Sequence, residues 1–571
     1  MTDRPAYPIK IVCRRPCHHH VVSSGLVDEG RAALRAGDTA AARELFESAL
    51  ADSESGVVLE GLGEALYLQR NYVAASEHYE RAYAVHRRDG NHLAAGLAAR
   101  TVGWICGHVR GDWAVRNGWF ARARTILGEV GEDRPEHGWV LLLDAYAEPD
   151  AGVRETLLRE AVAIGRRFGD PDIEFEALAS LGQVCVMTGR FDEGLALCDE
   201  SLTAACAGEL TDLATVEAIF CRFFWMCELA NDVPRADQWM RAAAGLVRRR
   251  HVIAAFCRAH YGGILTAAGR WDEAEAELVE ARRCSASGMP DGRAASLMRL
   301  ADLRLRQGDL DQAGMLLSGL DTHPDAVRTL AALHLARDKT ALARDLLERS
   351  VAGSDDDLPT VGDATVRGPL LALLVDVHIR QGDLDGADGI AQRLDRLVRL
   401  QHTPYLEAAT ALAKGRICVA RRDPDARRWL HSALQGFTRA QLPMELAETR
   451  LEMARALAQQ SPEVAVAAAK AALDDFERLK AARHADAAGA LLRSLGAPVR
   501  TGPKGFGTLT RRESEVLQLL GSGLSNVEIG DRLFISRKTA EHHVGNVLAK
   551  LGLRNRAEAA AYVTRENPAT R

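Results

Sequence analysis

Aromatic residues and long apolar runs are scarce in this 571-residue sequence. Phenylalanine, tryptophan and tyrosine make up only 5% of the residues, although apolar residues of all kinds make up 47%. Such a composition favours helices packed through small side chains over β-sandwiches and barrels, which are rich in aromatic and β-branched residues. No apolar run approaches the roughly 20 residues that a helix needs to cross a bilayer. The sequence therefore predicts an all-α protein that makes no use of a membrane, and we expect it to be cytoplasmic.

The sequence also lacks the cysteine spacing that is typical of disulfide frameworks and zinc sites. The 11 cysteines are odd in number and no two of them show C-x-x-C spacing, so reduced thiols that act as small apolar side chains are the simplest interpretation. Cys13 and Cys17 precede the run His18-His19-His20, and thiolates with imidazoles suit zinc. Three prolines and the absence of any periodic pattern favour the alternative. We predict that residues 1–22 are a disordered leader without a secretion signal, a metal or a cofactor.

The patterns that accompany catalysis are missing as well. No G-x-x-x-x-G-K-[ST] motif occurs, so the loop that cradles nucleotide phosphates is lacking. No alternation of strands and helices suggests a phospho-receiver domain. No nucleophile with a neighbouring base stands out from the helical background, and we predict that the chain is not an enzyme.

A short pattern of small and bulky residues recurs through residues 23–498. Two copies are Arg70-Asn71-Tyr72 with Ala75, Tyr79 and Ala82, and Gly269-Arg270-Trp271 with Ala274, Leu278 and Ala281. The same turn recurs at Gly37, Gly111, Gly189, Gly308 and Gly382. From residue 70 to 111 is 41 residues and from 269 to 308 is 39, a period that fits two helices and two turns. The small positions let antiparallel helices approach closely, and the bulky positions fill the groove of the next pair.

This repeat resembles the tetratricopeptide family. The resemblance implies an α-solenoid over residues 23–498, with a concave face that binds a protein or a small molecule. Within it, Phe220, Phe223, Phe224 and Met226 form one helical stripe. Core packing and the wall of a ligand pocket are the two interpretations of that stripe, and core packing is favoured.

Charge changes sign near the C-terminus. Pro498, Gly502 and Pro503 with further glycines predict a linker over residues 499–507. Residues 508–571 hold ten Arg and Lys against seven Asp and Glu, a net charge of +3, whereas the whole chain is −6 and the remainder is therefore −9. This asymmetry is typical of a basic binding module on an acidic carrier.

The last 64 residues carry readable helix starts. Thr510-x-x-Glu513 and Ser525-x-x-Glu528 are capping boxes, Asn555-x-x-Glu558 resembles one, and Ser536 can cap a further helix. The predicted helices are 511–521, 525–533, 537–551 and 556–564. Only residues 534–536 join the second to the third, which predicts a helix-turn-helix.

The third helix has one apolar and one polar side. Its apolar residues Ala540, Val544, Val547, Leu548 and Leu551 are expected to face Val516, Leu517, Leu520, Ile529 and Leu533. On the other side we predict contacts to DNA bases from Lys538, Thr539, Glu541, His542, Gly545 and Asn546. Lysine can donate to guanine and asparagine can pair with adenine, while Glu541 either accepts from cytosine or restrains Lys538. Contacts to phosphates are predicted for Ser525, Asn526, Arg532, Arg537, His543, Lys550, Arg554 and Arg556.

These segments resemble the LuxR-type DNA-binding domain. The resemblance rests on Leu-Thr-Arg-Arg-Glu-Ser-Glu-Val-Leu (509–517), Gly-Leu-Ser-Asn-Val-Glu-Ile-Gly (523–530), Leu-Phe-Ile-Ser-Arg-Lys-Thr-Ala-Glu-His-His-Val (533–544) and Lys-Leu-Gly-Leu (550–553). It implies that the third helix reads double-stranded DNA and that the last helix forms a homodimer. Members of the family often carry lysine where this chain has Glu541, which implies a different base preference.

Two functions from different classes follow. The first is a sequence-specific transcription regulator whose repeat region senses a protein or small-molecule partner and whose residues 508–571 bind an operator. The alternative is an interaction scaffold that sequesters another regulator through the repeats, with a secondary or vestigial DNA-binding tail.

Overall fold

The computed structural model divides the chain into two compact units, Met1–Gly496 and Ala497–Arg571. It describes residues 18–129, 133–250, 255–352, 361–400, 403–497, 509, 511–533 and 535–566. Within these ranges every regular element is a helix and no strand occurs, which confirms the predicted all-α fold. The expected linker, residues 499–507, lies outside the described residues.

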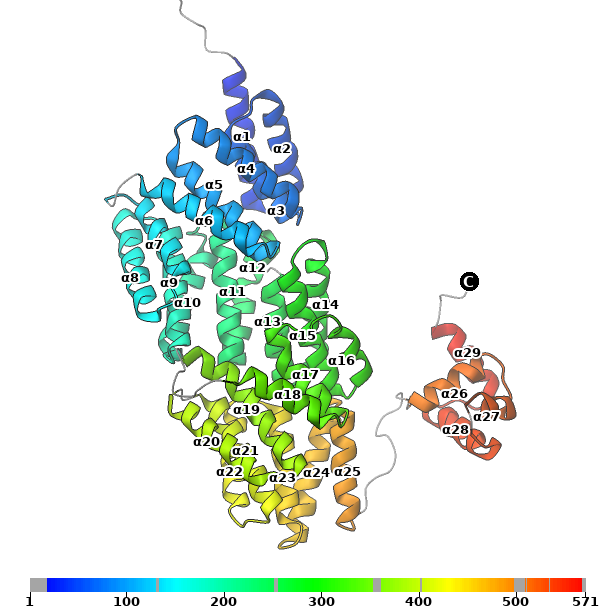
Figure 1. Ribbon diagram of the computed structural model, residues 1–571. Helices are drawn as coiled ribbons and strands as arrows, with labels where there is room; N and C mark the ends of the chain where they lie inside the picture. The colour runs from blue at the N-terminus through cyan, green and yellow to red at the C-terminus, as the bar shows by residue number, and fades with distance from the viewer. Residues whose placement is uncertain are drawn as a thin grey trace, which may run out of the picture. The chain divides into compact units, whose positions relative to one another are not determined.

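The first unit is an array of helices that follow one another as antiparallel pairs (Figure 1). Its helices are α1 (His18–Ala36), α2 (Thr39–Asp52), α3 (Gly56–Leu68), α4 (Tyr72–Arg88), α5 (His92–Trp104), η1 (Ile105–Val109), α6 (Trp113–Gly128), α7 (Glu136–Ala147), α8 (Ala151–Phe168), α9 (Pro171–Met187), α10 (Phe191–Ala207), α11 (Leu213–Ala230), α12 (Val233–Arg250), α13 (Ala255–Ala267), α14 (Trp271–Cys284), η2 (Ser285–Ser287), α15 (Pro290–Gln307), α16 (Leu310–Leu316), η3 (Pro324–Ala326), α17 (Val327–Ala336), α18 (Thr340–Ser350), α19 (Val361–Gln381), α20 (Leu384–Leu400), α21 (Pro404–Arg421), α22 (Ala426–Arg439), α23 (Pro443–Leu457), α24 (Pro462–Leu479) and α25 (Ala482–Ser494).

The first helix begins earlier than the sequence suggests. Helix α1 starts at His18, so the last residues of the expected leader 1–22 are helical. Cys13 and Cys17 lie outside the described residues, and the zinc alternative stays untested. The nine cysteines within the described ranges are thiols rather than disulfides, and the sulfur atoms of Cys221 and Cys257 lie 2.7 Å apart.

Glycines on one helix of a pair face bulky side chains on the other. A Cβ added to Gly63 of α3 would lie 2.9 Å from the ring of Tyr79 on α4, and one added to Gly262 of α13 would lie 2.6 Å from Leu278 on α14. Real Cβ atoms do not approach other atoms this closely, so the missing side chain is what lets the helices touch. These contacts confirm the small-and-bulky pattern of the tetratricopeptide-like repeat.

The turns between paired helices adopt a left-handed backbone conformation. The predicted turn residues Gly37, Arg70, Gly111, Gly189, Gly269, Gly308 and Gly382 all have positive φ, between 63° and 94°. Glycine adopts this conformation without steric cost. Arg70 is the member of this set that has a side chain, so its left-handed conformation is sterically unfavourable.

The aromatic stripe on α11 belongs to the core. Phe220, Phe223, Phe224 and Met226 are each 0% exposed and pack among the side chains of α10, α12 and α13. Core packing is therefore the correct interpretation of this stripe, and the pocket alternative is wrong for it.

The array also bends back so that distant repeats touch. The Tyr67 hydroxyl donates to Glu217 over 2.5 Å, and the Tyr72 hydroxyl contacts the Met289 sulfur at 3.6 Å. Residues of α3 and α4 thus lie against α11 and the segment before α15. A simple solenoid makes contacts between neighbouring repeats, so the repeat pattern does not predict this closure.

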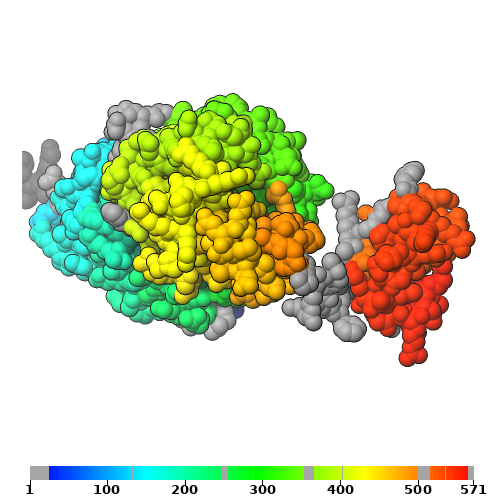
Figure 2. Space-filling view, turned by 90° about the horizontal axis from the view of Figure 1, so that it is seen from below, coloured from blue at the N-terminus to red at the C-terminus, as the bar shows by residue number. Residues whose placement is uncertain are grey.

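A second closure joins the middle of the array to its C-terminal end. Arg306 of α15 donates to Glu445 of α23 over 3.1 Å, and Lys480 lies 2.9 Å from Asp272 of α14. Figure 2 looks at this end, where the yellow and orange helices form the surface. Of the helices in the described ranges, none combines the length and apolar character needed to cross a membrane.

We expect the substitution Gly182→Ala to destabilise the array. A Cβ at this position of α9 would lie 2.6 Å from the carbonyl oxygen of Gly194 on α10, and backbone cannot move aside as a flexible side chain can. Urea unfolding followed by circular dichroism should show a loss of about 1–3 kcal/mol.

Gly118→Ala is the matched control. Gly118 lies within α6 and a Cβ there meets no atom within 4 Å, so alanine should raise stability by about 0.5–1 kcal/mol through its better helix propensity. Equal effects of the two substitutions would contradict the packing that we describe.

Candidate nucleic-acid interface

Within its described residues, the second unit is a small bundle of four helices with its own core. Its helices are α26 (Arg511–Gly521), α27 (Asn526–Leu533), α28 (Arg537–Lys550) and α29 (Arg556–Glu566). The core contains every residue that the sequence places there, with additions from α29: Val516, Leu517, Leu520, Ile529, Leu533, Ala540, Val544, Val547, Leu548, Leu551, Ala559, Tyr562 and Val563. One face of α28 is therefore committed to packing, which leaves the opposite face for a partner.

The capping box of α27 forms as predicted. The backbone N–H of Ser525 donates to the Glu528 carboxylate over 2.7 Å, and the N–H of Glu528 donates to the Ser525 hydroxyl over 3.3 Å. The hydrogen bond from the Ser525 N–H to the carboxylate holds the pKa of Glu528 below its usual range. Thr510, the first residue of the other predicted box, lies outside the described residues.

The turn between α27 and α28 is tight. The N–H of Ile535 donates to the Gly530 carbonyl over 2.9 Å, and a Cβ on Gly530 would lie 2.9 Å from the Ile535 oxygen. Ser536 caps α28 by accepting from the Thr539 N–H over 3.1 Å. Glycine at 530 is thus required for the short connection that sets the angle between the two helices.

The outward face of α28 carries the residues predicted to contact bases. Lys538, Thr539, Glu541, His542 and Gly545 are exposed, and Asn546 beside them is half-buried. A Cβ on Gly545 would meet nothing within 4 Å, so this position is open to solvent in the second unit. The six residues form one continuous polar surface, which we call the recognition face.

Glu541 has a different neighbour from the one expected. Its carboxylate accepts from Arg537, four residues earlier on the same helix, over 3.0 Å. The two roles considered for Glu541, accepting from cytosine and restraining Lys538, both stay predictions. An i,i+4 pair of opposite charge is the standard contact on a helix surface and is worth only a few tenths of a kcal/mol.

The residues predicted to contact phosphates fall into three groups. Ser525, Arg532 and Arg554 are exposed, whereas Asn526 and His543 are half-buried. Arg537 is exposed but pairs with Glu541, and Arg556 donates to the carbonyl of Leu524. The exposed members lie at or next to the ends of helices.

Lys550 is held inside the bundle. Its ammonium group pairs with the carboxylate of Glu513 on α26, and the two side chains are 19% and 5% exposed. Sequence reasoning missed this pair because Glu513 also fits a surface capping box. Since the charge of Lys550 has an internal partner, the residue joins α26 to the end of α28.

We expect Lys550→Ala to destabilise the contact between α26 and the end of α28. The substitution removes the cation beside a nearly buried carboxylate, and breaking such a pair is costly because a charge stays in a poorly solvated place. Hydrogen exchange of the full chain, measured by mass spectrometry, should show faster exchange of α26 and α28 amides, equivalent to about 2–4 kcal/mol. Arg554→Ala removes an exposed cation and should leave this exchange unchanged; a similar effect of both variants would refute the structural role of Lys550.

The second unit matches a known family. Residues 507–563 match the model of "Bacterial regulatory proteins, luxR family". The transcriptional regulatory protein LnrK of Bacillus subtilis is 49% identical over 57 residues, which are 10% of this chain and 26% of that protein. The DNA-binding transcriptional activator DevR/DosR of Mycobacterium tuberculosis is 42% identical over 79 residues, 14% of this chain and 36% of that protein. The match thus spans 26% and 36% of the length of these two relatives.

The helical array resembles a solved structure only distantly. A chain of the APC/C hetero-tetramer Cut9-Hcn1 aligns with 82% of this chain and 96% of its own length, at 15% identity and a TM-score of 0.39. The tetratricopeptide-like character of the array rests on its own paired helices, turns and glycine contacts. Residues 507–563 are a helix-turn-helix DNA-binding domain of the luxR family of bacterial transcription regulators, carried in one chain with a tetratricopeptide-like helical array.

Proposed function

We propose that this protein is a sequence-specific transcription regulator that acts in the bacterial cytoplasm and inserts α28 into the major groove of an operator. The observation that carries the proposal is the recognition face, which is polar and exposed while the opposite side of the same helix is buried in the core. A helix fits the major groove with one face toward the base edges, and a helix-turn-helix presents its second helix in this way.

Each residue of the recognition face has a task in this proposal. Lys538 donates to guanine O6 or N7, and Asn546 pairs with adenine N6 and N7. Gly545 has no side chain, so the helix axis can approach the floor of the groove. Thr539, Glu541 and His542 complete the reading of bases at the margins of the same face.

The cations around the recognition face fix its position. Arg532 and Arg554 are exposed and can meet phosphates directly. Arg537 and Arg556 contact phosphates after they release their internal partners, Glu541 and the Leu524 carbonyl. Ser525, Asn526 and His543 add further hydrogen-bond donors to the DNA backbone. Lys550 contributes by holding α28 in place. Because few of the cations around the recognition face lack an internal partner, the affinity for DNA depends on individual hydrogen bonds more than on the net charge of the domain.

The proposal includes a homodimer through α29, as the family resemblance implies. Two copies of α28 would then lie about 34 Å apart and read two half-sites of a pseudo-palindrome, one helical turn apart. The repeat region is the part that binds an effector, either a protein or a small molecule, and so adjusts the activity of the DNA-binding domain.

We expect Lys538→Ala and Asn546→Ala to relax base preference. Each substitution removes one set of hydrogen bonds to a base edge, so discrimination at one position of the operator should fall by about 1–3 kcal/mol. Competition between matched and single-base-changed duplexes, followed by fluorescence anisotropy of the full chain, measures this. Gln518→Ala, on the exposed side of α26, is the control and should leave discrimination unchanged.

We expect Arg554→Ala to weaken binding to all sequences alike and to reduce the dependence on salt. In a dimer that contacts roughly 4–8 phosphates, the logarithm of the affinity falls with the logarithm of salt concentration with a slope of about −0.9 for each phosphate. Loss of one contact in each subunit should lower this slope by about 2. A loss confined to one base sequence, or binding that is indifferent to salt, would contradict the proposal.

A further inference from the structure

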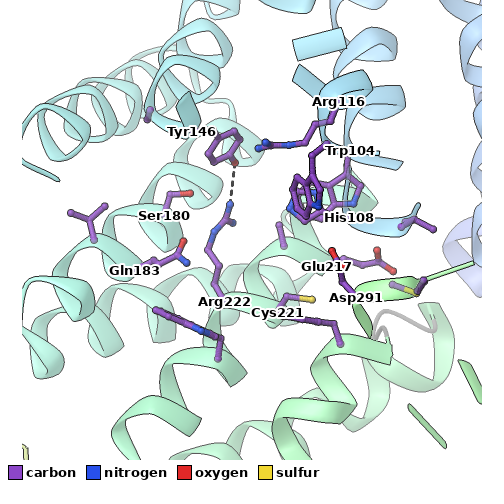
Figure 3. A pocket seen from close by; sticks show the side chains of 18 of the residues that line it. Trp104, His108, Arg116, Tyr146, Ser180, Gln183, Glu217, Cys221, Arg222 and Asp291 are labelled. Atoms are coloured by element: carbon purple, nitrogen blue, oxygen red, sulfur yellow. Dashed lines mark hydrogen bonds between the residues drawn. The ribbon is translucent and has the colours of Figure 1, made fainter. Parts of the chain in front are cut away.

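A cavity of about 450 Å³ lies in the first unit, where η1 and α6 meet α7, α9 and α11. This volume falls within the range of pockets that enclose small organic ligands. Figure 3 shows its side chains, which converge from helices that are far apart in the sequence. The cavity lies on the side of α11 that carries Glu217, Cys221 and Arg222, away from the aromatic stripe that the core absorbs.

One wall of the cavity is aromatic. Trp104 and His108 stack with their ring centroids 3.8 Å apart and their planes 20° apart, and Trp113 meets His108 edge-on at 5.5 Å. The stack spans the junction of α5 with η1, which is a π-helical turn, a deviation often found at functional sites. Burial and the charges of Arg116 and Arg222 lower the pKa of His108 to about 3, so this wall is neutral at physiological pH.

Arg116 brings to the cavity a cation that lies 4.5 Å from the ring of Phe120 and 5.3 Å from the ring of Trp113. Among the residues that the structure describes, its guanidinium has no carboxylate partner; one amino group donates to the Asn117 side chain over 3.2 Å, and Nε is buried without a hydrogen bond. The side chain lies across Gly107 of η1, in the place that a Cβ would need. Burial lowers the pKa of Arg116, the effect expected of a cation held in a poorly solvated place.

Arg222 supplies a second guanidinium. It pairs with Glu176 at 3.0 Å and donates to the Tyr146 hydroxyl over 3.1 Å, and its side chain is 12% exposed. Its Nη1 and the Ser180 hydroxyl are both buried without a partner in the described part of the chain. Figure 3 shows Arg116 and Arg222 both pointing toward Tyr146. Buried polar groups are normally bonded, so these donors are available to an acceptor that enters the cavity.

The other end of the cavity is acidic. Glu217 is 6% exposed and accepts from the Tyr67 hydroxyl over 2.5 Å. Burial raises the pKa of Glu217 to about 7, so this carboxyl can accept or donate a hydrogen bond near neutral pH. The lining thus runs from cationic donors through an aromatic wall to a carboxyl group.

A second cavity, of about 220 Å³, contains arginines whose partners can be compared with those of Arg116. There Arg306 pairs with Asp302 at 3.0 Å and with Glu445 at 3.1 Å, and Arg416 pairs with Asp376 at 2.7 Å. Arg306 thus has one carboxylate partner on its own helix and one on a neighbouring helix, and Arg416 has a carboxylate partner on a neighbouring helix. Arg116 differs from these two arginines because it has no carboxylate partner within the described residues.

We infer that the first cavity binds a small planar aromatic anion. Its ring would lie against Trp104 and His108, and its carboxylate, sulfonate or phosphate group would accept from Arg116, from the free Nη1 of Arg222 and from Ser180. Charge-assisted hydrogen bonds of this kind are the strong ones in a poorly solvated site. The inference rests on the proposed function, because it names the ligand class and the site for the effector of the repeat region.

The test uses two probes that share one aromatic body. The anion 8-anilinonaphthalene-1-sulfonate and its uncharged parent N-phenyl-1-naphthylamine are titrated into the full chain without DNA. Probe emission excited through tryptophan reports binding, and the variants described next assign it to the cavity. We expect one site for the anion, with an affinity about tenfold or more above that of the parent. Since no DNA is present, failure of this result and failure of operator binding are separate outcomes.

Substitutions then locate the site. Arg116→Gln should lower the affinity for the anion about tenfold without changing that for the parent, and Arg116→Lys should restore most of it. Arg124→Gln is the matched control, because Arg124 is an exposed residue of the same helix that pairs with Asp144. Circular dichroism verifies the fold of each variant.

Two results would overturn the inference. One is equal affinity of the wild-type chain for both probes, which does not depend on any variant being folded. The other is an anion affinity that is the same in folded Arg116→Gln and Arg124→Gln.

Discussion

The contact between a glycine on one helix and a bulky side chain on its partner is the interaction on which the array depends. It recurs at separate places along the chain, as Gly63 with Tyr79 and Gly262 with Leu278 show. Close approach covers the apolar face of each helix, which a single helix pair cannot do for itself. Among the buried polar groups that lack a partner in the described part of the chain, four belong to residues that line one cavity: His108, Arg116, Ser180 and Arg222.

That cavity exists because the array bends back on itself. Its lining combines Tyr67 of α3 with Glu217 of α11 and Asp291 of α15, which lie far apart in the sequence. The hydrogen bond between Tyr67 and Glu217 and the ion pair of Arg100 with Asp212, at 2.5 Å, hold the two sides together. A ligand bound there would touch both sides of the closure and would therefore be sensitive to its geometry.

Local patterns were sufficient to predict the helix-turn-helix and the turns of the array. The core face of α28 follows from residue spacing, and positive φ at Gly269 or Gly308 follows from the glycine itself. Contacts between distant residues were not predictable in this way. Arg116 belongs to no motif, and its significance appears only when α6 is placed beside α7 and α11. The ion pair of Glu513 with Lys550 was missed because both residues also suit a surface role.

The central claim is that the exposed face of α28 reads operator sequence in the cell. Genome-wide mapping of bound sites, for the wild-type chain and for Lys538→Ala produced at equal levels, tests it most directly. We expect discrete wild-type sites that share two half-sites about one helical turn apart, and variant sites that lose preference at one base position in each half-site. An identical motif for both proteins, or no discrete sites for the wild type, would contradict it.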